Sequence, residues 1–158
     1  MLYFTLIHPH LTYCCLVWSC AAKTNLARLN SLQKKAIRLI TNSDYLAASK
    51  PLFIKLQLLT LEDICISQTL QFLASFKLNL LPYACHTLLD IADANKRYNT
   101  RSGNYFKCST IRTNISKNCL RYRGPRLWEL LPIDIRNSVN IHAFKRGVKK
   151  FLIGKYIA

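Results

Sequence analysis

The sequence predicts a mainly α-helical, small domain with a short irregular β element in its basic C-terminal half. Apolar residues recur at helical spacing over residues 25–40, 61–77 and 140–152. With 158 residues, 51% of them hydrophobic, the chain is long enough to bury a core. Helical spacing fades between residues 92 and 124, where short polar residues, Arg and Tyr dominate. We therefore divide the chain into a helical region, 1–95, and a basic region packed on it, 96–158.

Residues 1–22 contain no Lys, Arg, Asp or Glu. Their length would suit a membrane span, but His8, Pro9 and His10 lie in the middle of the segment. This pattern favours a buried helix broken at Pro9, without stable membrane insertion. Because no polar lead-in or cap precedes the first apolar residue, we expect the chain to begin inside a larger structure.

The clearest helix spans residues 25–40, with Thr24 or Asn25 as its N-cap. One half of its helical wheel is apolar, and the other half is cationic with no acidic residue. The apolar positions are Leu26, Leu29, Leu32, Ala36, Ile37, Leu39 and Ile40, and the cationic ones are Arg28, Lys34, Lys35 and Arg38. The cationic half suits either a polyanion ligand or a merely solubilising surface.

After a polar turn at residues 41–50, Pro51 opens a short apolar piece. Thr60 and Asp63 have the spacing of a capping box, which predicts a helix from there to about Lys77. Its apolar residues cover a wide arc, so we expect it to be largely buried. Asn79 and Pro82 end it, and residues 83–91 form one more short helix.

For residues 92–124 we expect loops with short strands around 109–113 and 119–123. Aromatic residues alternate here with cations, a combination common in proteins that bind single strands by base stacking and phosphate contacts. The aromatics are Tyr98, Tyr105, Phe106 and Tyr122, and the cations are Arg97, Arg101, Lys107 and Arg121.

The stretch NCLRYRGPRLWELLP, residues 118–132, places a basic run directly against an apolar anchor of Leu127, Trp128, Leu130 and Leu131. We expect an extended segment that enters a short helix at Pro125, where proline suits a first helical position, and Pro132 limits that helix. The last helix begins at Asn140. Its core side is Ile141, Phe144, Val148, Phe151 and Leu152, and its outer side is Lys145, Arg146, Lys149 and Lys150.

The charge balance points to an anionic partner. The chain has 23 Lys and Arg against 7 Asp and Glu, a net charge of +16. Fifteen of the basic residues lie in 96–158, and no acid lies between Ala94 and Trp128. Nucleic acid is the commonest partner of such a domain, and an anionic membrane surface is next. The predicted nucleic-acid-binding residues are Lys34, Lys35, Arg38, Arg101, Arg112, Arg121, Tyr122, Arg123 and Arg126.

The sequence offers no catalytic set, so we predict that this chain is not an enzyme by itself and needs no cofactor. It has no Gly-rich phosphate loop, no G-x-S-x-G, no H-E-x-x-H and no two adjacent aspartates. Its seven cysteines show no C-x-x-C or regular spacing, so we expect reduced, mostly buried thiols in an intracellular protein and no metal site.

Several stretches resemble, in order, the region downstream of the polymerase core in the reverse transcriptases of non-LTR (LINE-type, Jockey-like) retrotransposons. They are LIHPHLTYCCLVW, LQKKAIRLI, PLFIKLQLL, LP at residues 81–82, YNTR at 98–101, RTN at 112–114, RYRGPRLWELLP and FKRGVKKFL. The resemblance covers nearly the whole chain. It implies a truncated C-terminal, thumb-like part of an RNA-directed DNA polymerase, whose catalytic palm aspartates lie upstream of Met1.

By this resemblance the chain helps to hold template and primer, and its partners are RNA or DNA, above all an RNA–DNA hybrid, and the missing polymerase core. It would then belong to a nuclear or cytoplasmic ribonucleoprotein. Two alternatives remain: a structural remnant or interaction module whose apolar N-terminus packs on that core, and a basic protein of membrane surfaces that uses residues 1–22 and the last helix.

Overall fold

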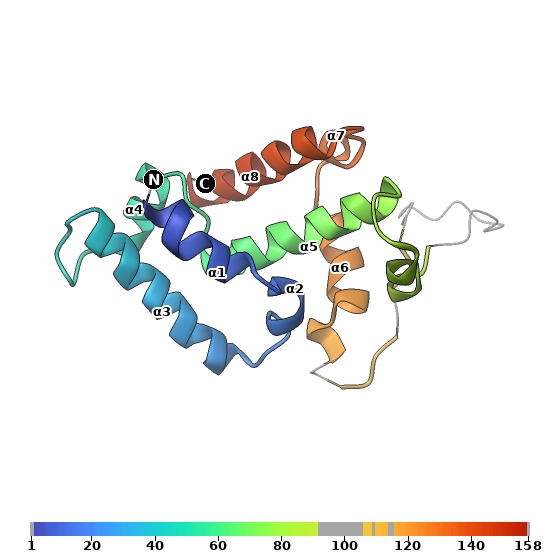
Figure 1. Ribbon diagram of the computed structural model, residues 1–158, viewed down its shortest axis with the longest axis horizontal. Coiled ribbons are helices and arrows are strands. Elements are labelled where there is room, and N and C mark those ends of the chain that lie inside the picture. The colour runs from blue at the N-terminus through green and yellow to red at the C-terminus, as the bar shows by residue number, and fades with distance from the viewer. Residues whose placement is uncertain (1, 92–105, 109, 114–115, 158) are drawn as a thin grey trace.

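The computed structural model describes residues 2–91, 106–108, 110–113 and 116–157, and these residues are mainly helical (Figure 1). In chain order the elements are the π-helix η1 (Tyr3–Ile7), α1 (His8–Thr12), α2 (Cys15–Trp18), α3 (Lys23–Ile40), α4 (Ser49–Lys55), α5 (Leu61–Lys77), the 3-10 helices η2 (Tyr83–Leu88) and η3 (Ser116–Asn118), α6 (Leu120–Glu129), α7 (Ile133–Arg136) and α8 (Ile141–Ile157). The predicted fold class, mainly α, is confirmed. The predicted boundary between residues 95 and 96 lies outside the described residues.

Helix α5 lies at the centre of the molecule, in contact with α1, α2, α3, α6 and α8 (Figure 1). Nine of its seventeen residues are buried, including the polar Ser67 and Thr69. A helix that is buried on most sides needs apolar neighbours all round, which explains the wide apolar arc in its sequence. The prediction that this helix is largely buried is therefore confirmed.

The main core lies where α5, α6 and α8 meet. Trp128 stacks on Phe144 with ring centroids 5.6 Å apart, and it meets Phe106 edge-on at 5.5 Å. Such aromatic pairs add about 0.5–1.5 kcal/mol each beyond the area that they bury. The buried members of this cluster are Leu70, Leu73, Ala74, Phe76, Leu89, Phe106, Trp128, Leu131, Phe144, Val148 and Leu152.

The predicted core side of the last helix is confirmed, but the apolar anchor before it is only partly buried. Phe144, Val148 and Leu152 of α8 are each at most 1% exposed, and Asn140 caps the helix by accepting a hydrogen bond from the His142 N–H. Leu131 is buried as expected, whereas Leu130 is 66% exposed. These two neighbouring residues follow the end of α6 and therefore point in different directions.

The predicted β element is not present in the described residues. They contain a single antiparallel bridge, between Ile91 and Phe106, and no strand. Residues 119–123 are predicted to be extended. In the structure Cys119 is the N-cap residue of α6, and residues 120–123 form its first turn. Residues 110–113 are irregular, and residue 109 lies outside the described part of the chain.

Helix α6 begins at Leu120, five residues before the expected start at Pro125. Proline inside a helix lacks one hydrogen-bond donor and disfavours the helical conformation in the residue before it, through clashes with that residue's N–H and Cβ. The preceding residue here is Gly124, which has no Cβ. Gly124 and Pro125 are both buried against the core, so the packing of α6 outweighs the lost hydrogen bond.

The N-terminal segment is not broken at Pro9 and is not a buried helix. The His8 N–H bonds to the Tyr3 carbonyl five residues back, in the wide turn of η1, and this turn accommodates the proline that follows. The break comes at Cys14, which has a left-handed backbone (φ 47°). Only one side of the segment packs inward, through Tyr3, Leu11 and Cys15.

Helix α3 begins at Lys23 and not at residue 25, and neither predicted N-cap residue caps it, because Ala22 is in that position without a side-chain hydrogen bond. Leu32 and Leu39 are 60% and 82% exposed, although both belong to the apolar half of the helical wheel. The fully buried residues are Gln33 and Ile37. Gln33 replaces an apolar side chain there because its Nε2 donates to the Tyr3 hydroxyl (2.8 Å) and to the Leu59 carbonyl (3.0 Å).

Only two of the seven cysteines are buried, so the prediction of mostly buried thiols is wrong. Cys15 and Cys65 are buried, Cys20 and Cys85 are partly exposed, and Cys14, Cys108 and Cys119 are exposed. All seven are reduced.

The start of α5 is tied to the end of α8 by one tyrosine. Thr60 caps α5 as predicted, by accepting a hydrogen bond from the Asp63 N–H. In a capping box the carboxylate would also accept from the N–H of the cap residue. Here the Tyr156 hydroxyl lies between the two groups. It accepts from the Thr60 N–H at 3.1 Å and donates to the Asp63 carboxylate.

Replacing Tyr156 by Phe should lower the free energy of unfolding by about 2 kcal/mol near pH 8, because both Thr60 and Asp63 lose a hydrogen-bond partner. Burial, and then the hydrogen bond to Asp63, raise the pKa of Tyr156 from 10.0 to about 12. A raised pKa stabilises the fold below pH 10, and this contribution is lost as the pH rises towards 12.

Urea unfolding of both proteins from pH 8 to pH 12 measures this effect. The advantage of the wild type over Tyr156→Phe should shrink above pH 10, and Tyr83→Phe, at an exposed ring, serves as the control. A constant difference across the range would contradict the assignment.

Candidate nucleic-acid interface

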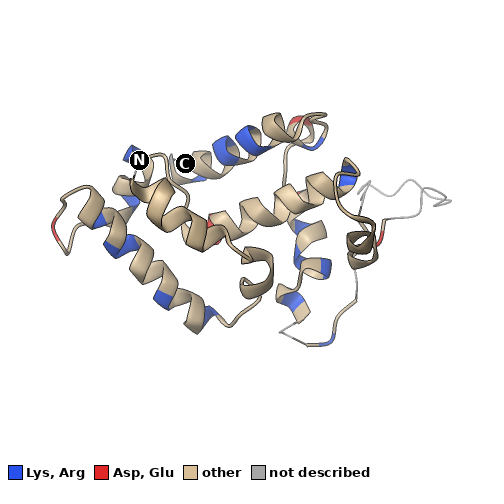
Figure 2. Cartoon of the chain, in the orientation of Figure 1, with Lys and Arg blue, Asp and Glu red and all other residues tan. Residues whose placement is uncertain are grey.

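Most of the described cationic residues lie on the outer helices that surround α5 (Figure 2). Helices α3, α6 and α8 each carry several Lys or Arg residues. Helix α5 carries only Lys77, in its last turn, and has the acidic pair Glu62 and Asp63 in its first turn. Among the described residues, the positive charge is therefore spread over several outer helices.

On α3, the three predicted residues have different environments. Lys35 is exposed and Lys34 is partly exposed. The Arg38 Nε donates to the Ala47 carbonyl at 2.9 Å, so this side chain holds the turn after α3. Arg38 is therefore partly engaged by the backbone, whereas no side-chain hydrogen bond of Lys34 or Lys35 is described.

On α6, Tyr122, Arg123 and Arg126 share one side of the helix, within about 100° of arc at 100° per residue. The Arg126 guanidinium lies over the Tyr122 ring, 4.0 Å from the ring centroid. This cation–π contact orders the arginine before any ligand binds, which reduces the conformational entropy that binding would remove.

Arg121 has a structural role instead. Its Nε donates to the Leu88 carbonyl at 3.1 Å and its Nη2 to the Thr87 carbonyl at 3.0 Å. These two bonds hold the C-terminal end of η2 against the start of α6. The sequence pattern grouped Arg121 with Arg123 and Arg126 because it predicted an extended strand, but the helix points Arg121 away from them.

The structure does not bring all the predicted site residues together. Lys34, Lys35 and Arg38 lie in the C-terminal half of α3, which runs away from α6 (Figure 1). Arg112 is exposed in the irregular segment before η3. Arg101, together with Tyr98 and Tyr105 of the aromatic pattern, lies outside the described residues. Phe106 is 1% exposed in the core, so the expectation that it stacks on a base is wrong.

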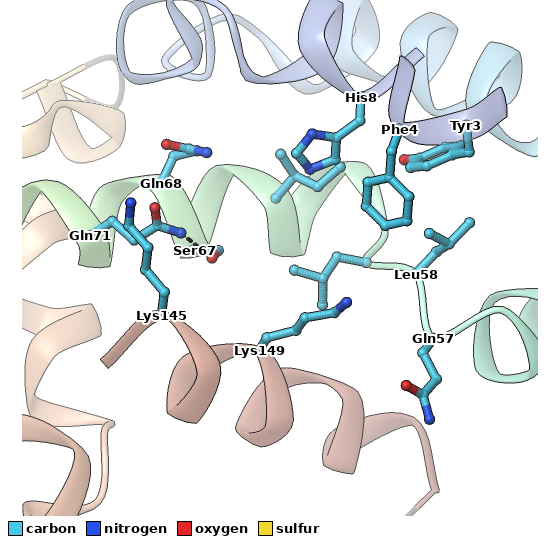
Figure 3. A pocket seen from close by; sticks show the side chains of 12 residues that line it. Tyr3, Phe4, His8, Gln57, Leu58, Ser67, Gln68, Gln71, Lys145 and Lys149 are labelled. Atoms are coloured by element: carbon cyan, nitrogen blue, oxygen red, sulfur yellow. Dashed lines mark hydrogen bonds between the residues drawn. The ribbon is translucent and has the colours of Figure 1, made fainter. Parts of the chain in front are cut away.

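A second cationic region, which sequence reasoning missed as a site, lines a groove between η1, α5 and α8 (Figure 3). Its cavity volume is about 240 Å³. Lys145 and Lys149 reach it from α8, and Phe4 and His8 face them from the N-terminal segment. The Lys149 Nζ lies 5.7 Å from the centroid of the Phe4 ring. From the sequence alone, the spacing of four residues indicates that the two lysines share a face of α8. No local sequence pattern predicts that Phe4 lies beside them.

The His8 ring adds a neutral aromatic surface to this groove. Its centroid lies 5.4 Å from that of Phe4. Burial, and then the charge of Lys149, lower the pKa of His8 below its usual 6.5, which keeps the ring uncharged near pH 7. Two ammonium groups beside two uncharged rings form a site that suits a phosphate linked to a flat base.

A second cavity, of about 450 Å³, lies between the N-terminal half of α3, the start of α5 and the start of α6. Lys23 and Arg123 line it together with Glu62 and Cys65. Asn30 also lines it, and the Asn30 Oδ1 is buried without a hydrogen-bond partner in the structure described.

Among the described residues, no three His, Cys, Asp or Glu side chains are grouped closely enough to hold a metal ion. None of the described helices is long and apolar enough to cross a bilayer. A comparison of the chain with known protein families, with curated proteins and with solved structures found no match.

Replacing Arg121 by Gln should destabilise the fold by about 1 kcal/mol, because two carbonyls of the segment 87–88 lose a charged donor at an exposed position. Urea unfolding measures the loss, and hydrogen exchange should show faster opening of η2. Arg112→Gln is the matched control, since Arg112 is an exposed arginine outside the helices. Equal stability of the two variants would contradict a structural role for Arg121.

Proposed function

We propose that this chain is the C-terminal, thumb-like part of a non-LTR retrotransposon reverse transcriptase, and that it binds RNA or DNA without sequence preference. The observation that carries the proposal is the net charge of +16 on a folded helical domain whose cations lie on its outer helices. Phosphate contacts depend on charge and not on base sequence, and they supply most of non-specific affinity. The motif series described above supports the family assignment.

The α6 surface, defined as Tyr122, Arg123 and Arg126, is the first of two proposed contact regions. Arg126 is pre-ordered on Tyr122, and Gly124 and Pro125 anchor the opposite side of the same helix in the core. Arginines on a docked helix lose less conformational entropy on binding than arginines on a loose tail. We propose that both arginines contact phosphates of the template–primer hybrid.

The α8 groove, defined as Phe4, His8, Lys145 and Lys149, is the second region. A base would stack on Phe4, which is 49% exposed, while Lys145 and Lys149 neutralise the flanking phosphates. Such a combination of stacking and charge favours a single-stranded segment over a duplex, because the bases of a duplex are already stacked.

The proposal assigns no catalysis to this chain. In the family that it resembles, the metal-binding aspartates belong to the palm, which precedes the region of resemblance. The chain would hold the hybrid inside a nuclear or cytoplasmic ribonucleoprotein, and the polymerase core would supply the chemistry.

The test is binding of a fluorescent RNA–DNA hybrid across a salt series in reducing buffer. Contact with about six phosphates predicts a slope of log affinity against log salt near −5, and Arg123→Gln/Arg126→Gln should make it shallower by about 2. The matched control, Lys50→Gln/Lys55→Gln, removes two exposed charges from α4 and should change the slope far less. A slope near zero, or equal effects of the two double variants, would contradict a nucleic-acid surface on α6.

The same series with single-stranded RNA and with anionic vesicles separates the alternatives. Lys145→Gln/Lys149→Gln should weaken binding of the single strand more than binding of the hybrid. Vesicle binding that competes with RNA and exceeds it in affinity would favour the membrane-surface alternative instead.

The exposed apolar side of the N-terminal segment favours a second function, in which this segment packs on the polymerase core. Leu2 and Leu6 are 61% and 63% exposed, and Val17 is 75% exposed. The opposite side of the segment holds Tyr3 and Leu11 in the core. The segment is therefore firmly attached while it presents large apolar side chains to solvent.

Without the polymerase core, we expect the chain to self-associate through these exposed apolar side chains. Leu2→Gln/Leu6→Gln/Val17→Gln should reduce association in sedimentation velocity at tens of micromolar protein, without loss of helical content. The control Leu46→Gln changes a residue that is 83% exposed in the turn after α3. A monomeric wild type, or equal effects of the two variants, would contradict this second function.

A further inference from the structure

Two cysteines that are fifty residues apart in sequence meet in the core. Cys15 of α2 is 2% exposed and Cys65 of α5 is 4% exposed. The Cys15 thiol donates a hydrogen bond to the Cys65 sulfur, and the two Sγ atoms are 3.2 Å apart. A disulfide requires an approach to about 2.05 Å, so movement of about 1 Å would suffice for a bond between them.

Cys65 is the member of the pair that an oxidant can reach. It lines the cavity of about 450 Å³ between α3, α5 and α6, and Arg123 lines the same cavity. Cys15 does not line this cavity. A small polar oxidant that enters from solvent would therefore meet Cys65 first, with Cys15 directly behind it.

The electrostatic surroundings favour the thiolate of Cys65. The hydrogen bond from Cys15 lowers the pKa of Cys65, and the charge of Arg123 acts in the same direction, against burial and Glu62. The pKa of Cys15 is raised, mainly because the neutral thiol is the hydrogen-bond donor. One sulfur is thus suited to act as nucleophile and the other to keep its proton.

We propose that Cys65 and Cys15 form an oxidant-sensitive dithiol that a hydroperoxide converts into a disulfide between α5 and α2. In the first step the Cys65 thiolate attacks one peroxide oxygen, the O–O bond breaks, and hydroxide leaves and takes up a proton as water. Cys65 becomes a sulfenic acid. In the second step the Cys15 thiol gives its proton to the sulfenic oxygen as its sulfur attacks the Cys65 sulfur. The S–O bond breaks, and the protonated oxygen leaves as a second water. Overall, two thiols and one hydrogen peroxide give one disulfide and two waters.

Oxidation of this thiol pair does not depend on nucleic-acid binding, although Arg123 belongs both to the α6 surface and to the cavity beside Cys65. Its structural consequence is a covalent link between the N-terminal segment and the central helix. Because α2 is only four residues long and follows the break at Cys14, it depends on packing against α5 for its position. The disulfide would fix that position.

The experiment treats the folded chain with increasing hydrogen peroxide, alkylates the remaining thiols and maps the peptides by mass spectrometry. We expect a Cys15–Cys65 disulfide to appear at lower peroxide than oxidation of the exposed Cys108. Since a disulfide that closes a loop of about fifty residues stabilises the fold, the oxidised protein should melt roughly 5–10 °C higher than the reduced one.

Two variants determine which cysteines form the disulfide. Cys14 is adjacent to Cys15 and falls on the same peptide, so Cys14→Ser should keep both the disulfide and the rise in melting temperature. Cys15→Ser should abolish both and leave a Cys65 sulfenic acid that dimedone traps. The proposal is overturned if Cys65 remains alkylatable after Cys108 is oxidised, or if Cys14→Ser abolishes the disulfide. It is equally overturned if the same disulfide forms at the same peroxide concentration in urea-unfolded chain.

Discussion

The need to bury α5 on most of its sides shapes the rest of the structure. More than half of its residues are buried, and their side chains extend around the helix, so one partner cannot cover them. The N-terminal segment and α3 cover the first half, through Leu61 and Ile64. Helices α6 and α8 cover the second half, through Leu70, Leu73 and Phe76. Since the outer helices use one side each for this packing, their charged sides face solvent.

Polar contacts fix the relative positions of the helices at places where apolar packing alone would allow several arrangements. Gln33 links α3 to Tyr3 in η1 and to Leu59 in the connection before α5. Tyr156 links the last helix to the first turn of α5. Both contacts join segments that are distant in sequence, and both involve side chains that are at least partly buried. Polar partners of this kind favour this arrangement of the helices, because moving the helices apart would break these hydrogen bonds, although the buried Gln33 Oε1 has no partner here.

The sequence was informative where local chemistry decides the structure. Thr60 with Asp63 located the start of α5, and the spacing of Phe144, Val148 and Leu152 located the inner side of α8. It misled where tertiary contacts overrule local preference. Gly124 allows α6 to continue through Pro125, and Leu39 is exposed because it lies on the opposite side of α3 from Ile37, which packs on α4. Of the predicted binding residues, Arg123 and Arg126 share a surface, whereas Arg121 and Arg38 hold backbone carbonyls, and no sequence pattern distinguishes these two uses of arginine.

The placement of the cations on three outer helices also makes the stability of the fold depend on its ionic surroundings. A net charge of +16 on 158 residues repels itself more strongly in the compact state than in the expanded chain. Added salt screens this repulsion over a Debye length of about 8 Å at physiological ionic strength. Unlike a neutral domain of the same size, this one should therefore become more stable as ionic strength rises, and a bound polyanion would act on its folding equilibrium much as salt does. Folding and polyanion binding are then coupled, because both depend on the mutual repulsion of the same cations.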